Sequence, residues 1–246
     1  FHETFKMDHS FYIGTSGFSY SAWKKSFYPD KLPSGQWLEY YSSQFNTLEL
    51  NSSFYHFPRI STLKKMNDST PDDFLFSIKM NRQVTHYSRM KDTKDLIDEF
   101  ILTAESGFGK KLGCILFQLP PSFKYSSENL DHILKNIPHE SRFVIEFRNI
   151  SWWNDDVFKT LEKHQLTFCN VSFPKLPDEI IMTTDIFYQR MHGIPEIFKS
   201  QYSEIELTKL AENIPKSAKQ KLVYFNNTMF EAGYTNSREL ISILEK

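Results

Sequence analysis

The chain has 246 residues, and its 29 Lys and Arg against 30 Asp and Glu give a net charge of −1. This balance excludes a strongly basic nucleic-acid-binding protein of the usual kind, although it leaves room for a local basic patch. The length fits either one α/β barrel of about 250 residues or two smaller domains. Aromatic residues make up 16% of the chain, so we expect a Phe-rich core and some rings lining a pocket.

The two cysteines, Cys114 and Cys169, lie in apolar, strand-like runs without any Cys/His ligand spacing. Isolated thiols of this kind predict a reduced, cytoplasmic protein. No apolar run approaches the ~18 residues of a membrane span, so we expect no membrane partner. The sequence begins with Phe1 and not with Met, and the first methionine is Met7. We interpret residues 1–10 as a lead-in or an expression remnant, and residues 11–246 as one domain.

Hydrophobic periodicity predicts strands that alternate with helices along the chain. The expected strands are 11–14, 47–50, 74–78, 113–117, 142–146, 166–171, 187–192 and 222–225. The expected helices are 37–45, 60–66, 93–108, 127–134, 155–163, 203–218 and 236–244, with Ser127 and Ser203 as N-caps of two of them. Residues 172–185 show no clear helical pattern.

This order predicts an α/β fold, a single (β/α)₈ TIM-type barrel with one weak or missing helix after strand 6. A doubly wound open sheet is the alternative, but it usually carries a Gly-rich phosphate loop after a strand. The stretch Gly14-Thr-Ser-Gly17 has too few glycines for that motif, and no other stretch supplies it. The barrel is therefore favoured.

In such barrels the active site lies at the carboxyl ends of the strands. Residues two apart on a strand point to the same face, so Glu146 and Arg148 are expected to point the same way. Polar residues end or follow nearly every predicted strand: Ser16, Glu49, Asn51, Lys79, Gln118, Glu146, Arg148, Asn170, Arg190, His192, Asn226 and Asn227. Polar groups are costly to bury without a partner, so we expect these side chains to converge on a ligand.

The charges in this set favour an anionic ligand. Lys79, Arg148 and Arg190 outnumber Glu49 and Glu146, and arginine suits capture of a carboxylate or phosphate. We therefore expect a phosphate ester or a sugar acid. A structural ion network is the alternative for Glu146 and Arg148, since such networks also lie inside barrels. The Asn226-Asn227 pair could equally form a turn.

Several stretches together resemble a known family. They are Ile13-Gly-Thr-Ser-Gly-Phe-Ser-Tyr-Ser-Ala-Trp23, Phe27-Tyr-Pro29, Leu50-Asn-Ser-Ser-Phe-Tyr-His-Phe-Pro58, Phe117-Gln-Leu-Pro-Pro-Ser-Phe123, Glu146-Phe-Arg148 with Ser151-Trp152, Arg190-Met-His-Gly193 and Tyr224-Phe-Asn-Asn-Thr228. In this order they resemble the YecE-like family, also called domain of unknown function 72. The resemblance implies a TIM-type barrel but no established reaction. Asn170 stands where the family is expected to carry Asp, and Phe18 where Trp is commoner.

The first functional hypothesis is a metal-independent enzyme, either a hydrolase or an isomerase or lyase, acting on an anionic small molecule. Lys79, Arg148 and Arg190 would hold the anion, while Glu49 or Glu146 would act with His192 in proton transfer. Carboxylates beside cations usually have lowered pKa values, which suits a base and leaves His192 as the acid. The substrate-binding set would be completed by Ser16, Tyr20, Trp23, Asn51, Tyr55, His86, Gln118, Trp152, Asn226 and Asn227.

Two further hypotheses remain open. A metal-dependent phosphoesterase or nuclease, resembling apurinic endonuclease barrels, would bind a divalent metal through Glu49, Glu146, His86 and His192. Arg148 beside Glu146 would repel that metal, so no cofactor is predicted. A non-catalytic protein that binds a nucleotide or single-stranded nucleic acid would stack bases on rim aromatics, namely Tyr20, Trp23, Tyr55 and Trp152. The loop position of Trp152 also suits an anchor, and the oligomeric state is not indicated.

Overall fold

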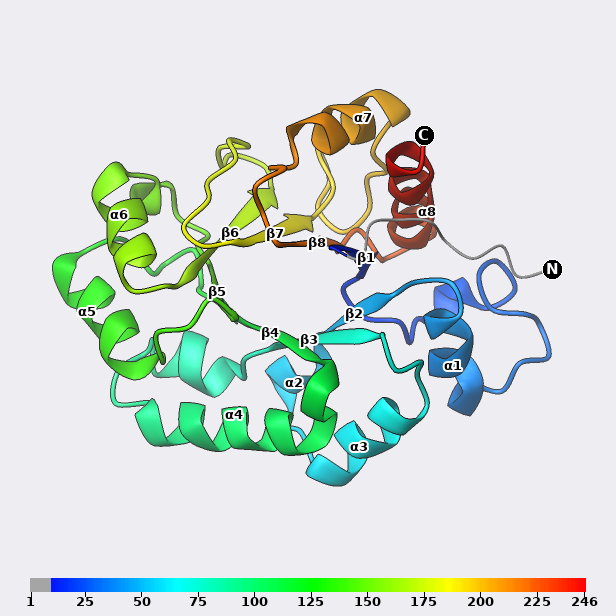
Figure 1. The fold of residues 1–246 in the computed structure, drawn as a ribbon, viewed down its shortest axis with the longest axis horizontal. Helices are drawn as coiled ribbons and strands as arrows, with labels where there is room; N and C mark the ends of the chain where they lie inside the picture. Colours follow the sequence, from blue (N-terminus) through cyan, green and yellow to red (C-terminus); the bar gives the residue numbers. More distant parts are fainter. Residues whose placement is uncertain (1–9) are drawn as a thin grey trace.

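Eight parallel strands form a nearly closed barrel with helices around it in the computed structural model, which describes residues 10–246 (Figure 1). The strands are β1 (Phe11–Thr15), β2 (Thr47–Leu50), β3 (Leu75–Lys79), β4 (Leu112–Gln118), β5 (Phe143–Glu146), β6 (Thr167–Ser172), β7 (Ile186–Met191) and β8 (Gln220–Phe225). They lie in the order β1-β8-β7-β6-β5-β4-β3-β2. The prediction of a TIM-type barrel is confirmed.

Helices follow most of the strands and cover the outside of the barrel (Figure 1). They are α1 (Trp37–Ser42), α2 (Ser52–Tyr55), α3 (Ile60–Asp68), α4 (Lys94–Phe108), α5 (Ser127–Asn136), α6 (Asp155–Lys163), α7 (Glu204–Asn213) and α8 (Ala232–Leu244). Short 3₁₀ turns lie at Ser21–Trp23, Ser34–Gln36, Gly109–Lys111 and Ile150–Trp152, and a π-helical turn at Gln83–Tyr87. Within residues 10–246 no helix has both the length and the apolar character needed to cross a membrane.

The barrel closes between β1 and β2 near the carboxyl ends of the two strands. Ser16 and Glu49 form a parallel bridge there, and the Gly17 amide donates to the Glu49 carbonyl at 2.8 Å. Gly14 lets the two strands approach, because a Cβ at this position would lie 2.2 Å from the Thr47 carbonyl oxygen. Glu49 therefore lies on the seam that closes the barrel.

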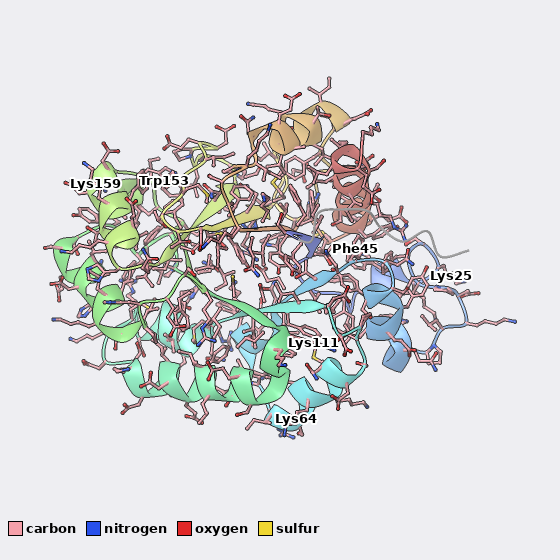
Figure 2. All side chains as sticks on the ribbon, viewed as in Figure 1. Lys25, Phe45, Lys64, Lys111, Trp153 and Lys159 are labelled. Carbon is pink, nitrogen blue, oxygen red and sulfur yellow. The ribbon has the colours of Figure 1, made fainter. Side chains whose placement is uncertain are left out.

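Side chains fill the inside of the barrel, as the stick view shows (Figure 2). An apolar cluster lines the interior: Leu75, Cys114, Leu116, Val144, Cys169, Val171, Ile186, Tyr188, Leu222 and Tyr224. A hydrogen-bonded group crosses it, in which Tyr224 contacts the hydroxyls of Thr47 at 2.7 Å and Ser77 at 2.9 Å. The interior is a packed core rather than a channel, so the carboxyl end of the barrel is where we expect the site.

The connection from β6 to β7, residues 173–185, contains no helix, as predicted. It is held against the outside of β6 by Asn170, whose amide donates to the Ile181 carbonyl at 3.1 Å and accepts from the Ile181 amide at 2.8 Å. Thr183 adds a hydrogen bond to the Leu166 carbonyl at 2.6 Å. Asn170 thus holds a covering segment on the outside of the barrel, and its grouping with the site residues was wrong.

Several predicted boundaries need correction. Ser126, not Ser127, is the N-cap of α5, because its hydroxyl accepts from the Asn129 amide at 3.1 Å. Ser203 caps α7 as predicted, but the helix ends at Asn213 because Pro215 disfavours helical geometry in the residue before it. Helix α8 begins at Ala232 rather than at residue 236. The prediction for residues 1–10 falls, except for Ser10, outside the described residues.

Replacing Asn170 with Ala should lower the free energy of unfolding by roughly 1–3 kcal/mol, because the main-chain amide and carbonyl of Ile181 both lose their hydrogen-bond partner. Asn213→Ala is the matched control, since that exposed amide donates only to the Lys209 carbonyl one turn earlier. Urea unfolding of both variants measures the difference. Equal losses in the two variants would contradict the holding role of Asn170.

Candidate functional site

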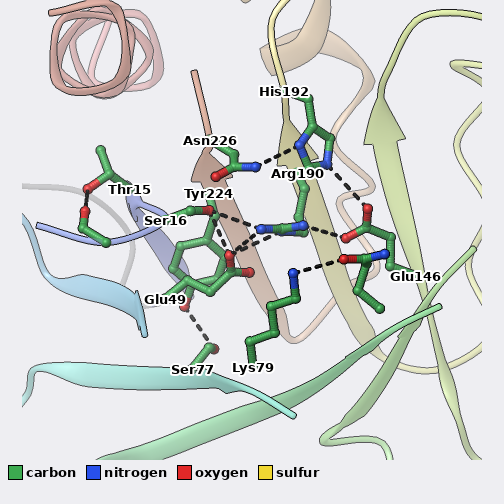
Figure 3. A network of polar contacts seen from close by, with 12 residues as sticks. Thr15, Ser16, Glu49, Ser77, Lys79, Glu146, Arg190, His192, Tyr224 and Asn226 are labelled. Carbon is green, nitrogen blue, oxygen red and sulfur yellow. Dashed lines mark hydrogen bonds and ion pairs between the residues drawn. The ribbon is translucent and has the colours of Figure 1, made fainter. Parts of the chain in front are cut away.

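The charged residues at the ends of β2, β5 and β7 form one buried network with Arg190 at its centre (Figure 3). The Arg190 Nε and one terminal nitrogen donate to Glu49 Oε1 at 3.1 and 2.7 Å. Its other terminal nitrogen donates to Glu146 Oε2 at 2.5 Å. Arg190 is 1% exposed and both carboxylates are 0% exposed. One guanidinium thus joins two strands on opposite sides of the barrel.

The remaining carboxylate oxygens also have partners. Ser16 donates to Glu49 Oε1 and Tyr188 donates to Glu49 Oε2, each at 2.6 Å. Arg148 pairs through its Nε with Glu146 Oε1. Two carboxylates are therefore balanced by two guanidiniums, which is the arrangement that a buried ion network requires. Most of the Arg190 donors are used inside the protein, which does not favour the prediction that Arg190 binds the anion.

These charges shift the pKa of Glu146. Burial by itself would raise it, but the neighbouring guanidinium of Arg148, followed by that of Arg190, holds the pKa well below its ordinary value. Glu146 therefore stays ionised at neutral pH. As in the predicted geometry, Glu146 and Arg148 meet directly.

His192 lies next to this network but remains neutral. Burial, and then the charge of Arg148, lower its pKa to about 3. The Asn226 amide contacts His192 Nδ1 at 2.9 Å, and His192 Nε2 lies 3.3 Å from Glu146 Oε1. His192 Nε2 also lies 3.2 Å from a terminal nitrogen of Arg148, which can only donate. This arrangement argues against His192 as the acid, because both ring nitrogens contact protein groups inside the network.

Lys79 is the one charged residue of this group without a carboxylate partner (Figure 3). Its ammonium donates to Gln118 Oε1 at 2.8 Å and lies 4.1 Å from the centroid of the Phe54 ring. Gln118 is held by its own amide, which donates to the Leu119 carbonyl at 2.8 Å. Burial, and then the charge of Arg190, lower the pKa of Lys79 to about 7. Lys79 is 9% exposed and exchanges its proton near neutral pH.

Half-buried polar groups lie around Lys79. His86 packs edge-on against Phe54 at 4.9 Å, and burial, followed by the charge of Lys79, lowers its pKa to about 4. The Oδ1 atom of Asn51, which follows β2, is buried without a hydrogen-bond partner. An unpaired buried acceptor is costly, so Asn51 is an energetically unfavourable position beside the end of β2.

Three predicted binding residues are buried. Trp23 donates to the Phe230 carbonyl at 2.8 Å, and Trp152 is buried between two Phe rings. The Asn227 amide donates to the Ser200 carbonyl and to Asn236 Oδ1, while its own Oδ1, like that of Asn51, has no partner. Placing the two tryptophans at the rim was wrong, and Trp152 is the loop anchor that was its alternative. Tyr20 is half-buried over Ser16, whose carbonyl accepts its hydroxyl at 2.5 Å.

The alternative metal set does not assemble. Arg190 lies between Glu49 and Glu146 and occupies the oxygens that a cation would need. Across residues 10–246 no group of three or more His, Cys, Asp or Glu side chains is placed to hold a metal ion. The carboxylates of Glu49 and Glu146 therefore serve the guanidiniums instead.

Sequence reasoning missed Tyr188, Phe54 and Phe173. Tyr188 precedes Arg190 by two residues on β7, so the alternation of strand side chains could have placed its hydroxyl beside Glu49. The Phe54 ring, on α2, lies 4.1 Å from the Lys79 ammonium, and the Phe173 ring, after β6, lies 4.2 Å from the Arg148 guanidinium carbon. No pattern in the sequence indicates such cation–ring contacts between separate elements.

Replacing Arg190 with Met should lower the free energy of unfolding by about 3–5 kcal/mol, because it leaves two buried carboxylates short of a partner. Arg142→Met is the control: its guanidinium pairs with Glu105 and Glu140 at the partly exposed surface, where a pair contributes about 1 kcal/mol or less. Urea unfolding compares the two. Similar losses would contradict the central role of Arg190.

The low pKa of His192 makes stability depend on pH. The unfolded chain binds a proton at this residue below about pH 6.5, whereas the folded chain does not until about pH 3. The free energy of unfolding should therefore fall as the pH drops from 6.5 towards 3. When the pH falls from 7 to 5, the free energy of unfolding of His192→Asn should decrease by roughly 1–2 kcal/mol less than that of the unmodified chain. Urea midpoints at both pH values test this, and parallel losses would contradict it.

The comparisons with other proteins point to one family. A family model described as "Protein of unknown function DUF72" matches residues 12–246. UPF0759 protein YunF of Bacillus subtilis is 31% identical over 155 residues, 60% of this chain and 54% of YunF. UPF0759 protein YecE of Escherichia coli K12 is 31% identical over 113 residues, 46% of this chain and 41% of YecE. The chain matches about half the length of these curated relatives, or less.

Solved structures extend the similarity to nearly the whole chain. A DUF72 family protein of Thermotoga maritima has a TM-score of 0.88 and 33% identity, covering 97% of this chain and 100% of its own. A DUF72 family protein of Enterococcus faecalis has a TM-score of 0.74 and 20% identity, covering 98% and 99%. D-psicose 3-epimerase of Clostridium cellulolyticum H10, with a TM-score of 0.52, 10% identity and coverage of 94% and 96%, shares the fold alone. The barrel, its strand-end residues and the match over residues 12–246 identify the chain as a member of the DUF72 family.

Proposed function

We propose that the protein is an enzyme that acts on an anionic substrate, a phosphate ester or a sugar acid, by metal-independent acid/base chemistry at the carboxyl end of the barrel. The observation that carries this proposal is the buried ammonium of Lys79, which has only neutral partners. Glu49 and Glu146 are balanced by Arg148 and Arg190, so the charge of Lys79 is left over.

A buried, unpaired charge is unfavourable, and two processes relieve it. The ammonium can bind an anion, or it can lose its proton. With a pKa of about 7, both forms of Lys79 are populated at neutral pH, which suits a general acid or base. Lys79 therefore replaces His192 as the proton-transfer group in this proposal.

Neighbouring residues would position the substrate. Gln118 orients the Lys79 amine through its 2.8 Å hydrogen bond, and Asn51 would accept from a substrate hydroxyl or amine through its unpaired oxygen. Arg148, whose side chain is mostly buried, would attract the anionic group from the edge of the network. Arg190 and the two carboxylates would act through their electric field and not by contact with the substrate.

A metal-dependent phosphoesterase is less well supported than this mechanism. Its carboxylate ligands, Glu49 and Glu146, would first have to release Arg190. Removing a guanidinium from two buried carboxylates is strongly unfavourable, and the incoming cation would then lie beside Arg148.

The proposal predicts that anions raise the pKa of Lys79. In NMR titrations of the protein labelled with ¹³C-lysine, one lysine resonance should titrate with a midpoint near pH 7. Inorganic phosphate or glucuronate should raise this midpoint, whereas uncharged glucose should not. Lys79→Met should remove that resonance, whereas Lys64→Met on α3 should leave it unchanged.

Turnover of a panel of phosphate monoesters, phosphate diesters and sugar acids completes the test. Lys79→Met should lower the rate of any active substrate by roughly 10²–10⁴-fold, the usual contribution of a positioned acid or base. Lys64→Met should keep full activity. A Lys79 pKa near 10.5 that no anion changes would contradict the proposal.

A further inference from the structure

The loops at the carboxyl ends of the strands divide into a basic half and an acidic half. The loops after β1 to β5, residues 16–36, 51–59, 80–93, 119–126 and 147–154, carry nine basic and two acidic side chains. The basic residues are Lys24, Lys25, Lys31, Arg59, Arg82, Arg89, Lys91, Lys124 and Arg148. The connections after β6 to β8 carry two basic and five acidic side chains. Because the charge of Arg148 is balanced by Glu146, a chain with a net charge of −1 gathers an unbalanced charge of +6 on five loops.

Exposed aromatic rings lie on the same basic loops. Tyr55 and Tyr87 are 57% and 62% exposed, and the Arg82 guanidinium carbon lies 5.5 Å from the centroid of each ring. Tyr125, after β4, is also exposed. Exposed rings beside guanidiniums offer stacking surfaces for planar groups of a ligand that also carries negative charge.

A continuous set of ring contacts joins Tyr55 to Lys79. Tyr55 packs edge-on against Phe54 with centroids 5.0 Å apart, and Phe54 packs against His86 at 4.9 Å. The Lys79 ammonium lies 4.1 Å from the centroid of the same Phe54 ring. A ligand bound on Tyr55 is therefore one ring away from the unpaired ammonium.

We propose that the basic loops bind single-stranded nucleic acid, with bases stacked on Tyr55 and Tyr87 and phosphates beside the Lys and Arg side chains. Each nucleotide supplies both a planar ring and a negative charge, which matches the Arg82 guanidinium beside the exposed rings of Tyr55 and Tyr87. A duplex hides its base faces, and an acidic peptide has no ring at each charge. The step in which one phosphate reaches Lys79 rests on the proposed function.

Fluorescence anisotropy with the full chain and a fluorescein-labelled oligothymidylate of twelve nucleotides tests this inference. Binding should weaken as salt increases, and Tyr55→Ala or Tyr87→Ala should raise Kd by roughly 5–100-fold, the effect of losing one stacked base. Phe230→Ala is the matched control, because that ring is 57% exposed but lies on the acidic half, in the β8 loop. It should leave Kd unchanged.

A charge variant separates phosphate contacts from stacking. Lys91→Ala, on the β3 loop, should reduce the slope of log Kd against log salt by about one, whereas Lys64→Ala on α3, at the periphery of the molecule in Figure 2, should not. Three results would overturn the inference: competition by poly-L-glutamate as strong as by the oligonucleotide, tighter binding of a duplex of equal length, or no effect of either tyrosine.

The two proposals fail separately. Oligonucleotide binding that is absent while phosphate still raises the pKa of Lys79 would refute only the nucleic-acid inference. Tight, tyrosine-dependent binding together with a Lys79 pKa that no anion changes would refute only the enzyme proposal, and would support a non-catalytic binding protein.

Discussion

The contact of Arg190 with Glu49 and Glu146 is the interaction on which the carboxyl end of the barrel depends. It joins β2, β5 and β7 across the barrel interior, where each charge would be highly unfavourable without the other two. Glu49 also accepts from Ser16 at the seam between β1 and β2. Closure of the barrel and neutralisation of its buried charges are therefore parts of one arrangement, and neither is expected to form without the other.

The same arrangement determines the chemistry of its neighbours. Burial and the nearest guanidinium lower the pKa values of both His192 and Lys79. The nearest guanidinium is that of Arg148 for His192 and that of Arg190 for Lys79. The same cause has different consequences, because the ordinary pKa values of the two side chains differ by about four units. His192 becomes a hydrogen-bonding group that is neutral at neutral pH, while Lys79 reaches the range in which a proton can be transferred at neutral pH.

The missing helix and the division of charge distinguish one side of the barrel from the other. Between β6 and β7, a segment held by Asn170 covers the strands where a helix would normally lie, and acidic residues predominate in the loops on that side. The loops after the first five strands are basic and carry the exposed rings of Tyr55 and Tyr87. Ligand binding at the carboxyl end of the barrel is therefore expected to extend towards α2 and the loop after β3.

The sequence by itself determined the barrel, the order of its strands and the strand-end positions of Glu49, Lys79, Glu146 and Arg190, because periodicity and turn residues are local properties. It could not determine which of these charges pair: Arg190 and Glu49 are 141 residues apart, and only the closed barrel brings them together. Burial is likewise a tertiary property. It made Trp23 a core residue instead of a rim residue, and it moved the expected proton transfer from His192 to Lys79.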